Sequence, residues 1–276
     1  MSQSVYDREG IFHNKQVQKA VETKGIDELV ALGFGTIYGL GLSTHTFDFV
    51  DVPGEFVRRL IDVRGKKILE IGCGIGVDAE YFAKAGAKQV KAVDLSESCL
   101  EVAKKRLKPY KNTVLLLSPF EELKLPQDET FDLIFARGAL HHLKLDISMQ
   151  KIRDHLKSGG KAVLIEPSSD NPFINLYRKL TPTKRTEDEA PLSNKVIRDL
   201  SRYGLTVSVY PFILIGLPIV LLMRGLRACY NKRVPSSIVL LLKFLFKLSE
   251  YIDKALFFIP FMKQWAWIKV IILAKK

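Results

Sequence analysis

The chain has 276 residues, of which 47% are hydrophobic and 26% are charged, a balance that excludes a disordered or fibrous protein. Residues 173–276 hold 18 Lys and Arg against 6 Asp and Glu, which accounts for the whole net charge of +12. This part either meets an anionic partner, such as a membrane surface or nucleic acid, or is a solvated basic surface. The three cysteines, Cys73, Cys99 and Cys229, lack metal-binding spacing, so we expect free thiols in a reducing compartment and no metal site.

The N-terminal segment, residues 1–53, has a helical middle and none of the apolar sequence that a secretory signal requires. Its stretch GFGTIYGLG gathers Gly33, Gly35, Gly39 and Gly41, which predicts a loop. The apolar spacing of residues 54–63 then predicts a helix.

An alternation of strands and helices begins at residue 66. Apolar runs predict strands, and amphipathic segments predict helices. Ser96 or Ser98 is expected to cap the second of these helices. The predicted strands span residues 66–72, 90–96, 112–118, 131–136 and 161–167. The predicted helices span residues 78–86, 96–107 and 147–160, the last of them ending in glycines. This order predicts a parallel sheet with helices on both faces.

Beyond the fifth strand the pattern is less regular. Residues 167–194 are polar and contain prolines, and a connection this long is expected to be functional or disordered. Residues 195–204 then predict a helix, and residues 205–212 and 267–276 predict two further strands.

The most informative stretch is ILEIGCGIG, residues 68–76, in which a strand ends at Glu70 and Ile71 and three alternate glycines follow. Glycine tolerates a positive φ and lets a ligand approach the backbone, and the next helix begins with free N–H groups. Asp94, at the end of the second strand, can accept both hydroxyls of a ribose. A nicotinamide nucleotide needs G-x-G-x-x-G for its pyrophosphate, whereas G-x-G-x-G beside an acidic residue suits a cationic ligand without phosphate.

With these motifs followed in order by FDLIFARGALHHL and LKSGGKAVLIEP, the chain resembles class I methyltransferases that use S-adenosylmethionine (SAM), of the broad type-11 group. The resemblance is strong over residues 64–168. It implies that the glycine loop surrounds the methionine part of SAM, that Asp94 binds the ribose and that Leu95 packs on the adenine. The residues that we expect at the cofactor are Glu70, Gly72, Cys73, Gly74, Gly76, Asp94, Leu95, Phe120 and Arg137.

One position departs from the family pattern. After the third strand the family often has an Asp that binds the adenine amine, whereas Ser118 or Pro119 stands here. We therefore expect the adenine to be held by packing and by the backbone N–H of Phe120, with Glu121 as a substitute acceptor. Arg137, at the tip of the fourth strand, faces the cofactor or the acceptor, or is a surface arginine.

Methyl transfer requires an aligned nucleophile and the exclusion of water, and a general base only where the acceptor must lose a proton. His141 and His142 follow the fourth strand, where the family's acceptor site opens, and either one is a candidate base or a structural residue. The resemblance also implies that the N-terminal segment folds over the cofactor as a lid. In that segment, His13, Tyr38 and His45 are either site residues or ordinary packing and surface residues. The candidate acceptor contacts after the fifth strand are Glu166, Tyr177, Arg178 and Arg185.

Residues 211–263 form an apolar and basic insertion between the last two predicted strands. Its apolar stretches, FILIGLPIVLLM and IVLLLKFLFKLSEYIDKALFFIPFM, flank Arg224, Arg227, Lys232 and Arg233. A narrow polar face along the second stretch is formed by Lys243, Lys247, Glu250 and Lys254.

Three interpretations of the insertion remain open. A spanning helix needs about 20 apolar residues, and residues 205–223 approach that length but contain Pro211, Gly216 and Pro218. A monotopic anchor would combine a wide apolar face with basic residues at its edge, and would lie on anionic lipid. The third interpretation is a cap over the core, over the acceptor pocket or against a second subunit.

The sequence thus predicts an α/β protein with a Rossmann-like, seven-stranded methyltransferase sheet, helices on both faces and an apolar helical insertion. The expected parts are a lid at residues 1–53, a SAM-binding core at 54–210, the insertion at 211–263 and a final core strand at 264–276.

The expected function is SAM-dependent methyl transfer to an apolar or membrane-associated small molecule, such as a lipid, a quinone or a sterol-like compound. The expected location is the cytoplasm, with peripheral membrane contact through the insertion. One alternative is a soluble metabolite or sugar as acceptor, with the insertion as a cap or homodimer interface, and another is a non-catalytic binding module. Nucleic acid is the less favoured partner, because the aromatic residues of the insertion lie inside apolar runs.

Overall fold

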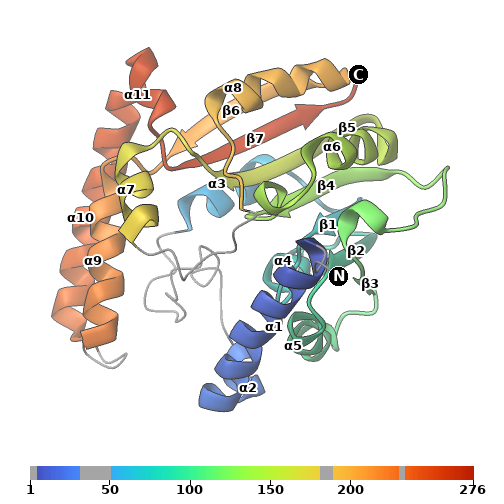
Figure 1. Ribbon diagram of the computed structural model, residues 1–276, viewed down its shortest axis with the longest axis horizontal. Helices are drawn as coiled ribbons and strands as arrows, with labels where there is room; N and C mark the ends of the chain where they lie inside the picture. Colours follow the sequence, from blue (N-terminus) through green and yellow to red (C-terminus); the bar gives the residue numbers. More distant parts are fainter. Residues whose placement is uncertain (1–4, 32–50, 181–188, 230–233) are drawn as a thin grey trace.

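The computed structural model describes residues 5–31, 51–180, 189–229 and 234–276 (Figure 1). Its centre is a seven-stranded sheet in the order β3-β2-β1-β4-β5-β7-β6. The strands are β1 (Lys67–Ile71), β2 (Gln89–Asp94), β3 (Thr113–Leu117), β4 (Phe131–Arg137), β5 (Leu156–Pro167), β6 (Thr206–Phe212) and β7 (Ile268–Ala274). The first five strands are parallel, and β7 runs antiparallel between β5 and β6. The predicted α/β sheet is thereby confirmed.

Helices cover both faces of this sheet, because successive side chains of each buried strand point to opposite sides. Ile68 and Phe135 pack with α3, α4 and α5 on one face, whereas Leu69 and Ile134 pack with α6 and α8 on the other. The α-helices are α1 (Val5–Lys24), α2 (Ile26–Val30), α3 (Val52–Leu60), α4 (Val77–Lys84), α5 (Glu97–Leu107), α6 (Leu145–His155), α7 (Pro172–Leu180), α8 (Asn194–Asp199), α9 (Gly216–Cys229), α10 (Ser236–Leu256) and α11 (Pro260–Gln264). Short 3-10 turns are η3 (Phe120–Glu122), η4 (Leu140–His142) and η6 (Leu200–Tyr203).

One local prediction is wrong, and one helix was not predicted. The helix expected to continue through the glycines at residue 160 ends at His155, because β5 already begins at Leu156, with Gly159 at a φ of 75°. The polar stretch 167–194 contains a helix that the sequence did not predict, α7, whose first turn is capped when Asn171 accepts the backbone N–H of Ile174 over 2.9 Å. At α5 the cap is Ser96, which accepts the N–H of Cys99.

The N-terminal helices α1 and α2 pack against α5. Asn14 accepts hydrogen bonds from the Ser96 hydroxyl and from the Ser98 N–H, and Arg106 donates to the Leu29 carbonyl. These contacts hold α1 beside the end of β2, so the N-terminal segment becomes part of the ligand-binding edge of the sheet.

Three helices, α9, α10 and α11, lie between β6 and β7 (Figure 1). Ile268 at the start of β7 pairs with Phe212 at the end of β6 and with Pro167 at the end of β5. The chain therefore leaves and re-enters the sheet at the edge where the parallel strands end. No helix in the described ranges combines the length and apolar character needed to span a bilayer.

Some residues of interest lie outside the described part of the chain, namely Gly33, Gly35, Tyr38, Gly39, Gly41, His45, Arg185, Lys232 and Arg233, and the side chains of Arg224, Arg227 and Cys229 are likewise not described.

Candidate cofactor and acceptor site

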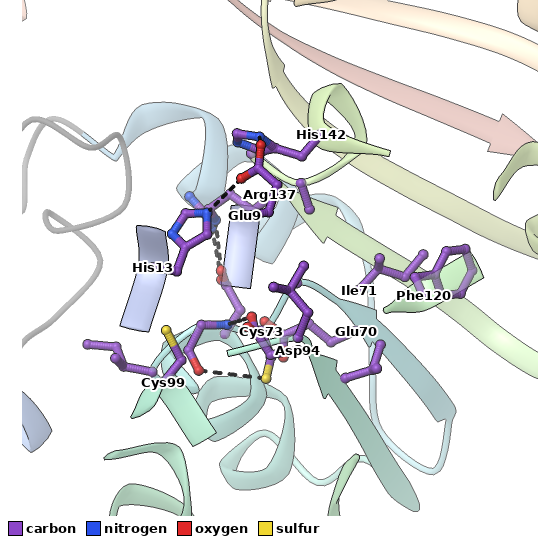
Figure 2. A pocket seen from close by; sticks show the side chains of 18 of the residues that line it. Glu9, His13, Glu70, Ile71, Cys73, Asp94, Cys99, Phe120, Arg137 and His142 are labelled. Carbon is purple, nitrogen blue, oxygen red and sulfur yellow. Dashed lines mark hydrogen bonds and ion pairs between the residues drawn. The ribbon is translucent and has the colours of Figure 1, made fainter. Parts of the chain in front are cut away.

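A cavity of about 340 Å³ opens at the carboxyl ends of β1, β2 and β4, with α1 on its other side (Figure 2). This is the edge at which open α/β sheets bind their ligands. The residues expected at the cofactor that line the cavity are Glu70, Gly72, Cys73, Gly74, Asp94, Leu95, Phe120 and Arg137. Gly76 is not part of the cavity wall among the described residues.

The glycine loop after β1 needs its glycines for three different reasons. Gly72, Gly74 and Gly76 all have a positive φ, which strains any residue with a Cβ. A Cβ on Gly72 would also lie 2.6 Å from the Ala139 side chain, and one on Gly76 would lie 3.1 Å from that of Ala103. At Gly74 nothing in the described chain lies within 4 Å of the Cβ position. Gly74 therefore leaves open the space that a ligand requires.

Asp94 joins the two loops that border the cavity. Its Oδ2 accepts the Gly74 N–H over 2.7 Å, and its Oδ1 accepts the Ser96 N–H over 2.9 Å. Burial raises the pKa of Asp94, although the backbone N–H groups partly offset that effect. Each carboxylate oxygen retains a lone pair for a further donor, such as a ribose hydroxyl.

Glu70 is a buried carboxyl group at the end of β1, and only 3% of the residue is exposed. Its Oε2 receives no hydrogen bond from the part of the chain that the structure describes. Burial, followed by the nearby charge of Asp78, raises the pKa of Glu70 well above the ordinary range for a glutamate. A cationic group of a ligand in the cavity would pair with this carboxylate and stabilise its ionised form.

Arg137 lines the cavity, but two carboxylates hold its guanidinium. Its Nε and Nη2 donate to the two oxygens of Asp78 over 2.7 and 2.9 Å, and its Nη1 donates to Asp51 over 2.6 Å. A Cβ on Gly54 would lie within 2.6 Å of these groups, so a glycine is needed there. The interpretation of Arg137 as a surface arginine is wrong, because it is 8% exposed and ties β4 to α3 and α4.

The two adjacent histidines have different surroundings. His141 is buried and its Nδ1 lies 2.6 Å from Glu166, which also accepts the N–H groups of Ala139 and Leu140. Glu166, expected at the acceptor, is 1% exposed and instead fixes this loop. His142 lines the cavity, and its Nδ1 lies 3.1 Å from Glu9 of α1.

At the far end of the cavity the wall is apolar. Phe120 is buried there, and the Ser118 hydroxyl donates to the carbonyl of Pro119. Glu121 accepts the Lys144 N–H and is not part of the described cavity wall. These positions leave packing and backbone groups to contact an adenine.

The cysteines and the residues after β5 differ in their relation to the cavity, because Cys73 and Cys99 line it whereas Tyr177 and Arg178 do not. Burial raises the pKa of the Cys73 thiol well above its ordinary value and that of Cys99 to about 12, so both are neutral at physiological pH. Arg178 donates to the carbonyl of Ser168, and neither it nor Tyr177 is among the residues that line the cavity.

Sequence reasoning missed several residues of the site, namely Glu9, Gln16, Asp51 and Asp78. Glu9 could have been found from its spacing, because it lies one helical turn before His13. Asp51 and Asp78 are recognisable only once the fold brings them to Arg137.

Comparisons with known proteins agree with this geometry. Residues 68–160 match the family model described as a methyltransferase domain. Residues 68–160 of the chain therefore form a methyltransferase domain. The fold is similar to that of a SAM-dependent methyltransferase from Mesorhizobium loti, with a TM-score of 0.53 and 17% identity over 79% of this chain and 95% of that one. It is also similar to phosphoethanolamine N-methyltransferase 2 of Haemonchus contortus in complex with SAM, with a TM-score of 0.59 and 18% identity over 95% of this chain and 60% of that one.

Curated relatives match the methyltransferase domain over a shorter stretch. A tRNA U34 carboxymethyltransferase of Shewanella sp. (strain ANA-3) is 35% identical over 105 residues, which is 37% of this chain and 32% of that protein. An uncharacterized protein of Haemophilus influenzae is 30% identical over 125 residues, which is 44% of this chain and 48% of that protein. The chain thus spans about a third to a half of the length of these relatives.

Proposed function

We propose that the protein transfers the methyl group of SAM to an apolar or membrane-associated small molecule, and that it works at the cytoplasmic face of a membrane as a peripheral protein. The observation that carries this proposal is that the insertion and the cofactor cavity share one edge of the sheet. An acceptor that enters through an apolar surface at that edge would have a short path to the cofactor.

The cavity suits SAM on three grounds. Glu70 offers a buried carboxylate to the cationic methionine ammonium, and Asp94 offers oxygens to the ribose hydroxyls. Leu95 and Phe120 supply apolar wall for the adenine. SAM contributes a methyl group already activated by the positive sulfur, so the protein has mainly to orient the acceptor and exclude water.

The acceptor side is the part of the cavity nearest α1 and η4. Glu9 and His13 reach it from α1, and His142 reaches it from η4 (Figure 2). Since His141 is held by Glu166 outside the cavity wall, His142 is the member of the pair that we place against the acceptor.

Helix α10 presents an apolar surface to the exterior, made of Leu240, Leu241, Phe244, Leu248 and Tyr251. These side chains recur at helical spacing, whereas a different side of the helix, including Leu242 and Phe246, is buried. The 64% exposure of Phe244 shows how much apolar area faces outward. A surface of this kind indicates a partner.

Charge indicates which partner this α10 surface meets. Lys243, Lys247 and Lys254 are exposed along one flank of α10, and residues 173–276 carry the whole net charge of the chain. Just beyond the helix, Phe258 is 86% exposed. Apolar side chains bordered by lysines are typical of a helix that lies in the interface of an anionic membrane.

The alternative acceptor is a soluble metabolite or sugar, with the α10 surface as a cap or homodimer interface. The tRNA named for the Shewanella relative is a weaker candidate, because the match leaves about two thirds of that protein uncovered. In addition, Phe244 and Tyr251 lie on an apolar surface rather than along a basic groove.

Vesicle flotation of the full chain tests the membrane part of the proposal. We expect binding to vesicles containing phosphatidylserine at low salt, weaker binding at high salt, and little binding to neutral vesicles. The double substitution Phe244→Glu with Leu248→Glu should abolish flotation. Its control is Ile147→Glu, which places a single negative charge on an exposed apolar position of α6, so each single variant, Phe244→Glu or Leu248→Glu, is compared with it.

The outcomes separate the alternatives. Another outcome is that the chain fails to float in every condition and has a dimeric mass in light scattering. If the double variant of Phe244 and Leu248 is then a monomer, the partner of the α10 surface is a second copy of the chain and not a membrane. Calorimetric titration with SAM tests the cofactor part independently, because none of these substitutions touches the cavity.

A further inference from the structure

Three side chains with metal-binding atoms converge at the acceptor side of the cavity. Glu9 and His13 are one turn apart on α1, and His142 comes from η4 (Figure 2). The Glu9 carboxylate lies between the two imidazoles, with Oε1 3.1 Å from His142 Nδ1 and Oε2 3.5 Å from His13 Nε2. One ligand atom from each of the three residues falls within 4.8 Å of the others.

These separations are close to those of a metal centre. Ligand atoms at about 2.0–2.2 Å from a tetrahedral ion lie roughly 3.3 Å from one another. Each histidine nitrogen already lies at about this distance from one of the two Glu9 oxygens, and one ligand atom from each residue falls within 4.8 Å of the other two. Two imidazoles and one carboxylate are also a ligand set that zinc, iron and other divalent transition metals accept.

The group is built like a site that leaves positions open. Glu9 is 1% exposed, whereas the two histidines are partly exposed and line the cavity. Three protein ligands facing a cavity leave coordination positions for a small molecule, in contrast to the four closed ligands of a structural zinc site.

Surrounding residues fix the orientation of His142. The ring of His141 lies 4.2 Å from that of His142, and His141 is in turn held by Glu166. The same Glu166 carboxylate accepts the N–H groups of Ala139 and Leu140, so the whole turn is anchored to β5. Such outer contacts are what hold a ligating histidine in position.

The cavity wall has an excess of negative charge, which favours the binding of a cation in addition to the cofactor. The described wall contains four carboxylates, from Glu9, Glu70, Asp78 and Asp94, against the single guanidinium of Arg137. SAM brings two positive groups and one carboxylate, a net charge of +1, to the cofactor end beside Glu70 and Asp94, whereas Glu9 lies at the acceptor end. A divalent ion beside Glu9 would supply positive charge there.

We propose that Glu9, His13 and His142 bind a divalent transition-metal ion, and that this ion holds an oxygen of a hydroxyl-bearing acceptor. The choice of acceptor rests on the proposed function, whereas the metal site does not. A bound hydroxyl loses its proton to solvent more readily. Its oxygen lone pair then forms the bond to the methyl carbon while the carbon–sulfur bond breaks, and the electron pair leaves on the neutral thioether S-adenosylhomocysteine.

This proposal departs from the expectation of no metal site. The sequence shows no metal motif, because Glu9 and His142 are 133 residues apart and meet only when α1 packs over the end of the sheet.

Cobalt titration of the untagged, chelator-treated full chain tests the site. We expect one equivalent of Co²⁺ to bind with visible absorption bands, and Zn²⁺ to displace it. His13→Gln, His142→Gln and Glu9→Gln should each weaken Co²⁺ binding by about tenfold or more, since even outer contacts of metal sites contribute ten- to a hundredfold. The control is His155→Gln, because that histidine lies on α6 and bonds the carbonyl of Glu129.

Two results would overturn the metal site: no stoichiometric Co²⁺ absorption, or the same Co²⁺ affinity in the wild type and in all three variants. Either result would leave Glu9 as a carboxylate hydrogen-bonded to His142 and paired with His13, without a metal ion. Calorimetric SAM titration of the same samples separates the proposals, because SAM binding without Co²⁺ binding refutes the metal and keeps the methyltransferase function. Failure of a folded chain to bind SAM refutes that function.

Discussion

Gly74 donates its backbone N–H to the side chain of Asp94 over 2.7 Å, so the two loops that border the cavity are joined to each other before any ligand enters. A carboxylate that is already oriented by backbone donors loses less freedom when it binds a ribose. We therefore expect the hydrogen bond between Gly74 and Asp94 to support both the shape of the cavity and its affinity for a ribose.

Substitution Asp94→Ala should weaken SAM binding by about tenfold or more, because a lost hydrogen bond to a charged group is worth roughly 1.5–3 kcal/mol. Isothermal calorimetry measures the effect. Asp132→Ala is the matched control, since Asp132 also accepts a backbone N–H, that of Lys67, but lies outside the cavity wall. Equal SAM affinity in the Asp94 variant and in this control would contradict the assignment.

Gly74→Val should abolish SAM binding, because its side chain would enter the open space at that position. Gly74 has a φ of 52°, so the substitution should also destabilise the fold by about 1–2 kcal/mol. Gly204→Val is a control with the same strain, since Gly204 has a φ of 76° and no neighbour within 4 Å, but caps η6 away from the cavity. Retention of SAM affinity in the Gly74 variant would show that the ligand does not approach this loop.

Arg137→Met should lower the free energy of unfolding by about 3–5 kcal/mol, because the buried carboxylates of Asp51 and Asp78 would lose their shared cation. Urea denaturation followed by circular dichroism measures this change. Arg64→Met should leave stability nearly unchanged, because Arg64 pairs with Asp62 in full contact with solvent. Equal stability of the two variants would mean that the buried cluster contributes little.

Glu70→Gln should have opposite effects on stability and on SAM affinity. Burial raises the pKa of Glu70 in the folded chain, so its contribution to stability is present at acid pH and is lost as the pH rises from the ordinary glutamate pKa toward the raised one. Without SAM, the variant should therefore melt above the wild type at pH 8, with a difference that shrinks toward pH 5. SAM should bind the variant about tenfold more weakly, because the ammonium loses its carboxylate.

Thermal melts from pH 5 to pH 8, together with SAM titrations at pH 8, check both parts of this prediction. A wild type that melts above the Glu70→Gln variant at pH 8 would mean that the carboxylate has a partner in the folded chain without SAM.

The wall of the cavity at the glycine loop and Asp94 was predictable from the sequence because its determinants are local. The glycines that end β1 and the aspartate that ends β2 are separated by one helix, and parallel strands bring them to the same edge. Strand periodicity likewise predicted where β1 to β5 lie along the chain, whereas α7 was missed because prolines and polar residues surround its apolar positions.

The wall of the cavity at α1 and η4 depends on contacts that no local pattern encodes. His141 and His142 are adjacent in sequence, yet one bonds Glu166 inside the core and the other faces Glu9, because consecutive residues of the 3-10 turn η4 point in different directions. The orientation of Arg137 depends in the same way on Asp51, which lies 86 residues away.

The place of β7 has a consequence for how the molecule is made. This strand is the last of the seven in the chain, yet it lies inside the sheet, between β5 and β6. During synthesis, β6 and the three helices of the insertion therefore leave the ribosome before β7, which is the strand that pairs with β6. Until residues 268–274 emerge, the edge of β5 is unpaired, and the C-terminal end of the insertion is not attached to the sheet. We expect the nascent chain to depend on protection of that edge during synthesis.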